Sequence, residues 1–153
     1  MVPMQAGERA LNRAIVTAEI SRSFEEYLEI FDAFYAEDIT AGSDQQEDPI
    51  GGKANVRGLV FNFLVPLHVL AEVGGLKVTV RATPIPGDTL NETHSVWTLD
   101  LTGAFGAKST LTWSLLRRWR GSRVVCECHY DHHQAGWPLT FEDLRFAGLE
   151  ARP

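Results

Sequence analysis

The sequence is poor in cysteine and in positive charge, and it has no long uninterrupted apolar segment. Its two cysteines, Cys126 and Cys128, lie two residues apart on a predicted strand, a poor geometry for a mutual disulfide, and this favours a reducing cytoplasm. The net charge of −6, from 14 basic and 20 acidic residues, argues against nucleic-acid binding as the main function. The richest apolar stretch, residues 59–73, is interrupted by Pro66 and Glu72, so it predicts a core helix and not a membrane span.

Several motifs of known chemistry are also missing. The sequence has no phosphate-binding loop, dinucleotide fingerprint or nucleophile elbow, which leaves nucleotide binding and serine hydrolysis without support. Residues 1–8 lack the apolar segment of a signal peptide, so none is predicted. With 153 residues, 44% of them hydrophobic and 22% charged, the chain is predicted to form one domain, with a core over residues 10–135 and a tail over residues 136–153.

Helical periodicity is confined to the first half of the chain. An apolar stripe at positions 10, 11, 14, 15 and 18 predicts a first helix over residues 10–20. The capping-box pattern of Ser23 and Glu26 predicts a second helix, whose apolar face reaches Tyr35. A third helix is predicted to start near Lys53, to kink at Pro66 and to end at Gly74-Gly75.

The second half has the spacing of strands. Turn signals separate four segments that predict strands over residues 76–83, 89–101, 107–120 and 124–131. Three hairpins in series make an antiparallel meander. Helices followed by a meander predict an α+β domain, with three N-terminal helices packed on one face of a strongly curved antiparallel sheet. Thr140 and Asp143 fit the cap of a short helix after Pro138.

The last predicted strand carries ionisable side chains at alternate positions. Because successive side chains of a strand point to opposite faces, Glu127, His129 and Asp131 are predicted to share one face. They form either a proton-transfer set, in which the carboxylates favour imidazolium and burial opposes it, or a structural cluster at a solvated strand end. A metal site at the same three residues is a third alternative, although the usual zinc-ligand spacings are missing. The opposite face would hold Val124, Cys126, Cys128 and Tyr130.

Bulky apolar side chains alternate on the two preceding strands. These residues either fill the core or form the wall of a hollow in it: Trp97, Leu99, Leu111, Trp113 and Leu115. Basic side chains gather near the Gly121-Ser122 turn and are interpreted as the charged end of a hairpin, with an anion site as the alternative. They are Arg117, Arg118, Arg120 and Arg123.

This order of elements, three helices and then four long antiparallel strands, resembles the nuclear transport factor 2-like superfamily over residues 10–131. Two stretches carry the resemblance. Residues 34–40 (FYAEDIT) with residues 47–52 (EDPIGG) look like the "YADDAT…EDPVG" stretch of ketosteroid isomerases, and residues 118–125 (RWRGSRVV) look like the last hairpin of the superfamily. The resemblance implies a cone-shaped α+β barrel.

The resemblance also implies roles for particular residues. The Asp of "EDPVG" is the general base of ketosteroid isomerases, so it corresponds to Asp48, which before Pro49 is equally a turn residue. The isomerase oxyanion hole uses a Tyr of the first helix and an Asp of the penultimate strand. Here residues 10–20 hold no tyrosine and the strand position is Leu115, so steroid isomerisation itself is not predicted. Small polyketide cyclases place their catalytic Asp at the position of His129.

The predicted function is acid/base proton transfer on a hydrophobic, cyclic small molecule, of the isomerase, cyclase or dehydratase type, for which no cofactor or metal is required. The predicted catalytic residues are Asp48, Glu127, His129 and Asp131. Asp48 or the His129–Asp131 pair would act as the base, and Glu127 would orient the substrate or donate. The residues predicted to enclose the substrate are Trp97, Leu99, Trp113, Leu115 and Tyr35. The alternative is a non-catalytic module of the same fold, for ligand binding or protein assembly.

The partners predicted from the sequence are a small hydrophobic molecule and a second copy of the chain, with neither nucleic acid nor membrane expected. The outer face of the sheet would form the homodimer, because it is apolar and lightly charged for a solvent face. Its residues are His94, Val96, Thr98, Cys126, Cys128 and Tyr130.

Overall fold

A computed structural model describes residues 4–21, 25–44, 48–58, 77–86, 91–103 and 108–136. Two helices come first, α1 (Met4–Ser21) and α2 (Glu25–Phe34), and a third helix begins at Lys53 and is described as far as Gly58. The strands are β1 (Tyr35–Ser43), β2 (Ile50–Gly51), β3 (Lys77–Ile85), β4 (Glu92–Thr102), β5 (Lys108–Arg120) and β6 (Arg123–Gly136).

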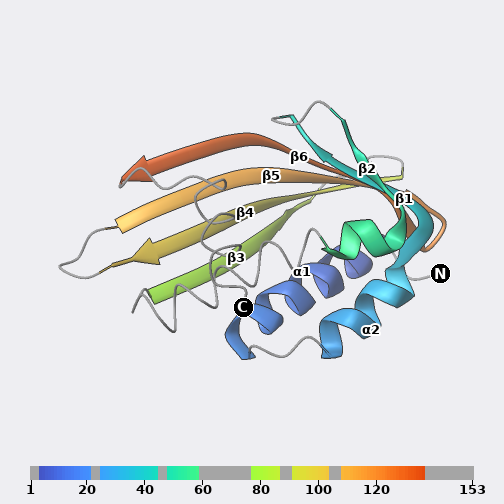
Figure 1. Ribbon diagram of the computed structural model, residues 1–153, viewed down its shortest axis with the longest axis horizontal. Helices are drawn as coiled ribbons and strands as arrows, with labels where there is room; N and C mark the ends of the chain where they lie inside the picture. The colour runs from blue at the N-terminus through green and yellow to red at the C-terminus, as the bar shows by residue number, and fades with distance from the viewer. Residues whose placement is uncertain are drawn as a thin grey trace.

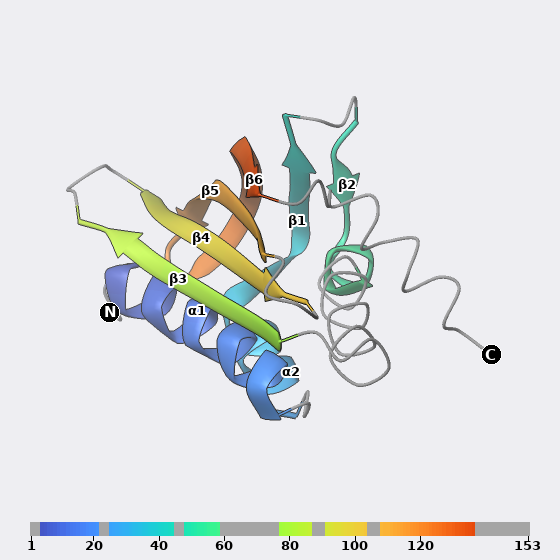
Figure 2. The ribbon, with the colours of Figure 1, turned by 90° about the vertical axis from the view of Figure 1, so that its left-hand side faces the viewer.

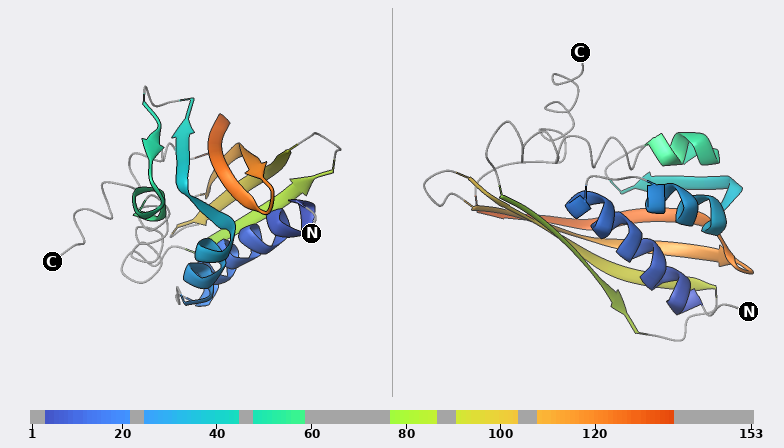
Figure 3. Two further views of the ribbon diagram at one scale, coloured as in Figure 1. Left: turned by 90° about the vertical axis from the view of Figure 1, so that its right-hand side faces the viewer. Right: turned by 90° about the horizontal axis from the view of Figure 1, so that it is seen from below.

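The six strands form one curved sheet in the order β2-β1-β6-β5-β4-β3. Strands β3 to β6 make the predicted antiparallel meander, and β1 adds a parallel pairing with β6. The helices lie under the concave face of the sheet (Figure 1), and α1 runs along β3 and β4 (Figures 2 and 3). This confirms the α+β fold with helices packed on a curved sheet. None of the described helices has the length and apolar character needed to cross a membrane.

The core lies between the helices and the concave face. Along β4 and β5 every second side chain is buried, the alternation expected of a sheet with one covered face. Trp97 and Trp113 are direct partners across these strands, with ring centroids 6.0 Å apart, and Leu99 pairs with Leu111. Phe31 of α2 closes the core from below, stacked on Tyr35 at 4.2 Å.

Strand β1 was not predicted from the sequence. The second helix was expected to include Tyr35, but it ends at Phe34 and the chain continues as a strand. Tyr35, Ile39 and Ala41 are buried because β1 pairs with β6 inside the sheet. Tertiary pairing therefore overrides a helical pattern that continues from α2. The predictions that concern Ser23, Pro66, Gly74-Gly75 and the helix after Pro138 fall outside the described residues.

Two β-bulges interrupt the predicted alternation of β6. The first leaves Val125 unpaired, so Val124 enters the core and does not share a face with Cys126. The second places two residues of β6 opposite Trp113, and Asp131 there has a φ of 55°. The regular alternation on which the prediction for Asp131 rested is therefore broken at this residue.

The residues predicted for the outer face of the sheet lie at outward positions of β4 and β6. His94, Val96 and Thr98 of β4 are half-buried, as are Cys126, Cys128 and Tyr130 of β6. His94 Nδ1 lies 3.3 Å from the hydroxyl of Tyr130. Dimerisation through this face stays a prediction.

Gly7 of α1 lies against Trp119 of β5 with no room for a side chain. A Cβ atom there would lie 2.6 Å from Trp119 Cη2 and 3.2 Å from Phe34 Cε1. We therefore expect Gly7→Ala to lower the free energy of unfolding by about 1–3 kcal/mol, the usual cost of overpacking, despite the better helix propensity of alanine. Urea denaturation would measure the change.

Gly58→Ala is the matched control, because a Cβ atom at this other helical glycine would have no neighbour within 4 Å. Alanine should leave stability unchanged or raise it by up to about 1 kcal/mol there. Equal stability of Gly7→Ala and the wild type would show that α1 does not pack against Trp119 as described.

Candidate functional site

A buried arginine occupies the centre of the concave face. Arg117 takes the next inward position after Trp113 and Leu115 on β5, and its side chain is fully buried. Its Nη1 donates to Glu8 Oε1 at 2.6 Å and to Asn12 Oδ1 at 2.8 Å, and its Nε donates to Glu127 Oε1 at 2.9 Å. One guanidinium thus joins helix α1 to strand β6.

Further polar groups complete what we call the Arg117 cluster. Glu8 also accepts hydrogen bonds from the hydroxyls of Thr93 and Ser95, and Ser95 accepts a hydrogen bond from Asn12 Nδ2 at 2.8 Å. The Tyr35 hydroxyl donates to Glu127 Oε1. The members of the cluster are Glu8, Asn12, Tyr35, Thr93, Ser95, Arg117 and Glu127. Each buried member therefore finds partners, as buried polar groups must.

Glu127 has an unusual environment for a carboxyl group. It is buried, and Arg117 cannot balance both its charge and that of Glu8. Burial, followed by the negative charge of Glu8, raises the pKa of Glu127 to about 8. Near neutral pH this side chain is therefore a carboxylic acid. Since Oε1 accepts from Tyr35 and from Arg117, the acid proton is assigned to Oε2.

His129 is held as a neutral imidazole. Its Nδ1 lies 3.1 Å from Trp113 Nε1, and an indole nitrogen only donates, so Nδ1 must accept and the hydrogen resides on Nε2. Burial lowers the pKa of His129 to about 4, with smaller contributions from the charges of Arg117 and His132. The ring is still 36% exposed, but the Trp113 donor independently requires the same direction, because imidazolium would place two N–H groups against each other.

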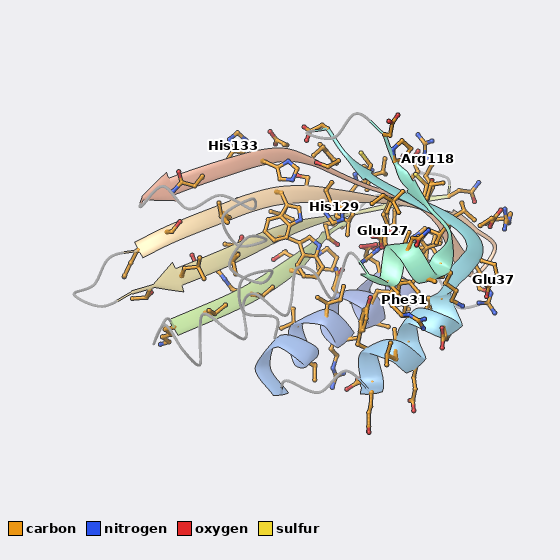
Figure 4. All side chains as sticks on the ribbon, in the orientation of Figure 1. Phe31, Glu37, Arg118, Glu127, His129 and His133 are labelled. Atoms are coloured by element: carbon orange, nitrogen blue, oxygen red, sulfur yellow. The ribbon has the colours of Figure 1, made fainter. Side chains whose placement is uncertain are left out.

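Two hydrogen-bond donors therefore face each other across a short gap. Glu127 Oε2 and His129 Nε2 are 3.9 Å apart, too far for a direct hydrogen bond, and no described residue donates to Oε2. Both side chains lie on the concave side of the sheet (Figure 4). An acceptor oxygen could sit about 2.8 Å from each, a normal hydrogen-bond length. We call this pair the Glu127–His129 gap.

The structure brings together only part of the predicted catalytic set. Glu127 and His129 share the concave face as expected. The Asp131 side chain is 62% exposed and lies 2.8 Å from His133 Nε2, outside the gap. Asp48 is exposed beside β2, and no described contact joins it to Glu127 or His129. No three described side chains converge as ligands of a metal would.

The predicted substrate wall is buried beside these residues. Trp97, Leu99, Trp113 and Leu115 all point to the concave side, and Leu115 is the cross-strand partner of His129. Trp113 also donates a hydrogen bond to His129. Tyr35 was predicted to enclose the substrate, but its hydroxyl donates a hydrogen bond to Glu127.

Sequence reasoning missed Glu8, Asn12 and Arg117. Arg117 was grouped with the exposed arginines of the hairpin, of which Arg118 and Arg120 do form surface ion pairs. The available signal was its position: it continues the inward series of Leu111, Trp113 and Leu115 at a spacing of two. A charge at such a position requires a buried partner.

Comparisons with known proteins agree on the fold. No family model matches the sequence, and no curated protein matches it. A solved structure from Rhodopseudomonas palustris, provisionally named an isomerase, is 16% identical with a TM-score of 0.59, over 98% of this chain and 99% of its own. An NTF2-like protein of unknown function from Exiguobacterium sp. 255-15 is 10% identical with a TM-score of 0.55, over 87% and 99%. The chain has the nuclear transport factor 2-like fold.

A third neighbour with this nuclear transport factor 2-like fold holds a ligand. It is a Mycobacterium tuberculosis protein in complex with estradiol-17β-hemisuccinate, 16% identical with a TM-score of 0.50, over 82% of this chain and 93% of that one. At these identities the likeness shows the fold alone.

The raised pKa of Glu127 gives the folded protein a particular pH dependence. Between the ordinary value of 4.5 and about 8 the native state holds a proton that the unfolded state has lost, so stability falls as pH rises. His129 acts in the opposite sense between about 4 and 6.5. From pH 6.5 to 8 the contribution of Glu127 is larger than the remaining contribution of His129, and the wild type should lose roughly 1–2 kcal/mol.

Glu127→Gln should flatten this interval, because the amide has no proton to release. Urea denaturation at several pH values would measure it, with Glu92→Gln, which removes a carboxylate from the surface pair with Arg118, as the control that keeps the wild-type slope. The same slope in Glu127→Gln and the wild type would mean that Glu127 is already ionised at pH 6.5.

Proposed function

We propose that this protein binds a hydrophobic, cyclic small molecule through a carbonyl oxygen and promotes acid/base proton transfer on it, of the isomerase, cyclase or dehydratase type. The observation that carries the proposal is the Glu127–His129 gap, in which two donors stand 3.9 Å apart beside a wall of apolar side chains. A carbonyl oxygen is the acceptor that such a pair fits.

The chemistry follows from the state of the two donors. A carbonyl oxygen that accepts from Glu127 Oε2 and His129 Nε2 is polarised, and the negative charge of an enolate would develop between them. Because its pKa is about 8, Glu127 still carries at neutral pH the proton that it would give to this oxygen. No cofactor is needed for such a step.

The proposal changes the role predicted for His129. Its Nδ1 lone pair is used by Trp113 and its Nε2 carries hydrogen, so it donates to the substrate and does not remove a proton. Asp48, which matches the base of ketosteroid isomerases, stays the predicted base. Asp131 has no part in the proposal, because its side chain is 62% exposed and pairs with His133.

The ligand class rests on the wall and on the neighbours. Trp97 and Trp113 are stacked and buried on the concave face, where a flat apolar ring system would meet them. The structural neighbour from Mycobacterium tuberculosis was crystallised with a steroid ester. These observations support a polycyclic ketone as the first ligand to test.

Deuterium exchange would test the reaction. A panel of steroid and decalin ketones in D2O would be incubated with the protein, and mass spectrometry would follow deuterium entering the carbon next to the carbonyl. We expect the wild type to accelerate exchange for at least one ketone, and Glu127→Gln to lose about a hundredfold or more, as when one oxyanion donor is removed. Glu37→Gln, with a side chain that is 89% exposed, should retain the wild-type rate.

Binding separates this proposal from its alternative. Quenching of tryptophan fluorescence by estradiol-17β-hemisuccinate would report occupation of the wall by a steroid. Binding without exchange of any ketone would favour a non-catalytic ligand-binding module. Exchange that survives in Glu127→Gln would contradict the assigned role of Glu127, and the absence of both binding and exchange would contradict the proposed ligand class.

A further inference from the structure

We propose that Glu8 of α1 is a positioning residue for the Glu127–His129 gap: it carries the counter-charge of Arg117 and thereby leaves the proton on Glu127. The catalytic consequence rests on the proposed function, whereas the charge assignment can be tested without any substrate. Glu8 lies in the first helix, more than a hundred residues away in sequence from either partner.

The charges of the buried cluster balance only if one of its two carboxyl groups is neutral. Arg117 and Glu8 are both fully buried, and Glu127 is nearly so. With Glu8 ionised and Glu127 neutral, the three groups sum to zero. If both carboxyls were ionised, the cluster would hold an uncompensated negative charge away from water, which is strongly unfavourable.

Arg117 contacts the carboxyl groups of Glu8 and Glu127 unequally. It contacts Glu8 at 2.6 Å and Glu127 at 2.9 Å, and because attraction between opposite charges grows as they approach, the closer carboxyl group is favoured to carry the charge. Both oxygens of Glu8 accept hydrogen bonds, from Arg117, Thr93 and Ser95. Glu8 therefore has the environment of a carboxylate.

The hydrogen-bond geometry between Arg117 and Glu127 also favours a neutral Glu127. An ionised carboxylate beside the Nε edge of an arginine usually takes Nε and Nη2 together, one with each oxygen. Here Nη2 has no partner among the described residues, and only Oε1 of Glu127 is used. Oε2 is left facing His129, as the hydroxyl of a carboxylic acid would be.

Among the residues that the structure describes, no other group next to Glu127 carries a charge. Burial, with the charge of Glu127 next, raises the pKa of Tyr27 on α2, so its phenol stays neutral. Tyr35 of β1 donates a hydroxyl, and His129 of β6 is neutral. Arg57, in the helix that begins at Lys53, is a cation whose charge opposes this rise in the pKa of Tyr27. Glu8 is thus the carboxylate that decides where the proton lies.

Carbon-13 NMR of the glutamate side-chain carboxyl groups would test this inference in the whole chain. The wild type should show Glu127 titrating near pH 8. The Glu8→Gln variant keeps the shape and an acceptor oxygen but leaves Glu127 as the carboxyl group that must balance the charge of Arg117. The pKa of Glu127 should therefore drop by about 1–3 units. Glu92→Gln on the surface should leave the Glu127 titration unchanged.

Asn12→Asp provides a second variant with the opposite sign. Its Oδ1 atom already lies 2.8 Å from Arg117 Nη1, so a second carboxylate there would raise the pKa of Glu127 further. If Glu8→Gln does not fold, this variant decides the question. A Glu127 titration that stays at the wild-type pH in either folded variant overturns the inference.

The outcome is distinguishable from failure of the proposed function. If Glu127 shifts as expected and no ketone exchanges deuterium in any protein, Glu8 does position the proton and the proposed reaction is wrong. If the wild type exchanges deuterium and Glu8→Gln retains both its pH profile and the titration of Glu127, the reaction stands and the role of Glu8 is wrong.

Discussion

One buried guanidinium between two carboxyl groups is the constraint on which the site depends. Arg117 needs a negative partner because it is removed from water, and it has two candidates within 3 Å on different elements. Only one of them can be charged without leaving the core negative. The fold therefore fixes a protonation state as well as a shape, because α1 brings Glu8 against the same arginine that holds Glu127 of β6.

The site differs from that of ketosteroid isomerases in the residues that supply its hydrogen-bond donors. The strand position of their oxyanion-hole Asp is Leu115 here, and residues 10–20 contain no tyrosine. Two donors nevertheless converge on the concave face, one a protonated carboxyl group, Glu127, and one a neutral imidazole, His129. Both donors come from the last strand, and Trp113 and Arg117 of the neighbouring strand β5 set the state of each. Under the proposed function, the same fold would hold its two donors on residues different from those of the isomerases.

The sequence predicted what depends on local periodicity and could not predict what depends on distant partners. The meander and the common face of Glu127 and His129 follow from alternation along β4, β5 and β6, and the structure confirms them. The exposed position of Asp131 was not predicted because nothing local marks the bulge at this residue. Glu8 and Arg117 went unnoticed as a pair because their contact spans 109 residues. The pKa values of Glu127 and His129 depend on the burial and charges that such contacts create.

The central claim is that His129 is a neutral donor with its hydrogen on Nε2 near neutral pH. Nitrogen-15 NMR of the His129 ring tests it most directly, in the wild type and in Trp113→Phe, with Trp97→Phe as the control that removes the stacked but non-donating indole. We expect a protonated Nε2, an unprotonated Nδ1 and a pKa near 4 in the wild type and in Trp97→Phe, and a higher pKa in Trp113→Phe. A wild-type ring protonated on both nitrogens at pH 7 would contradict the account.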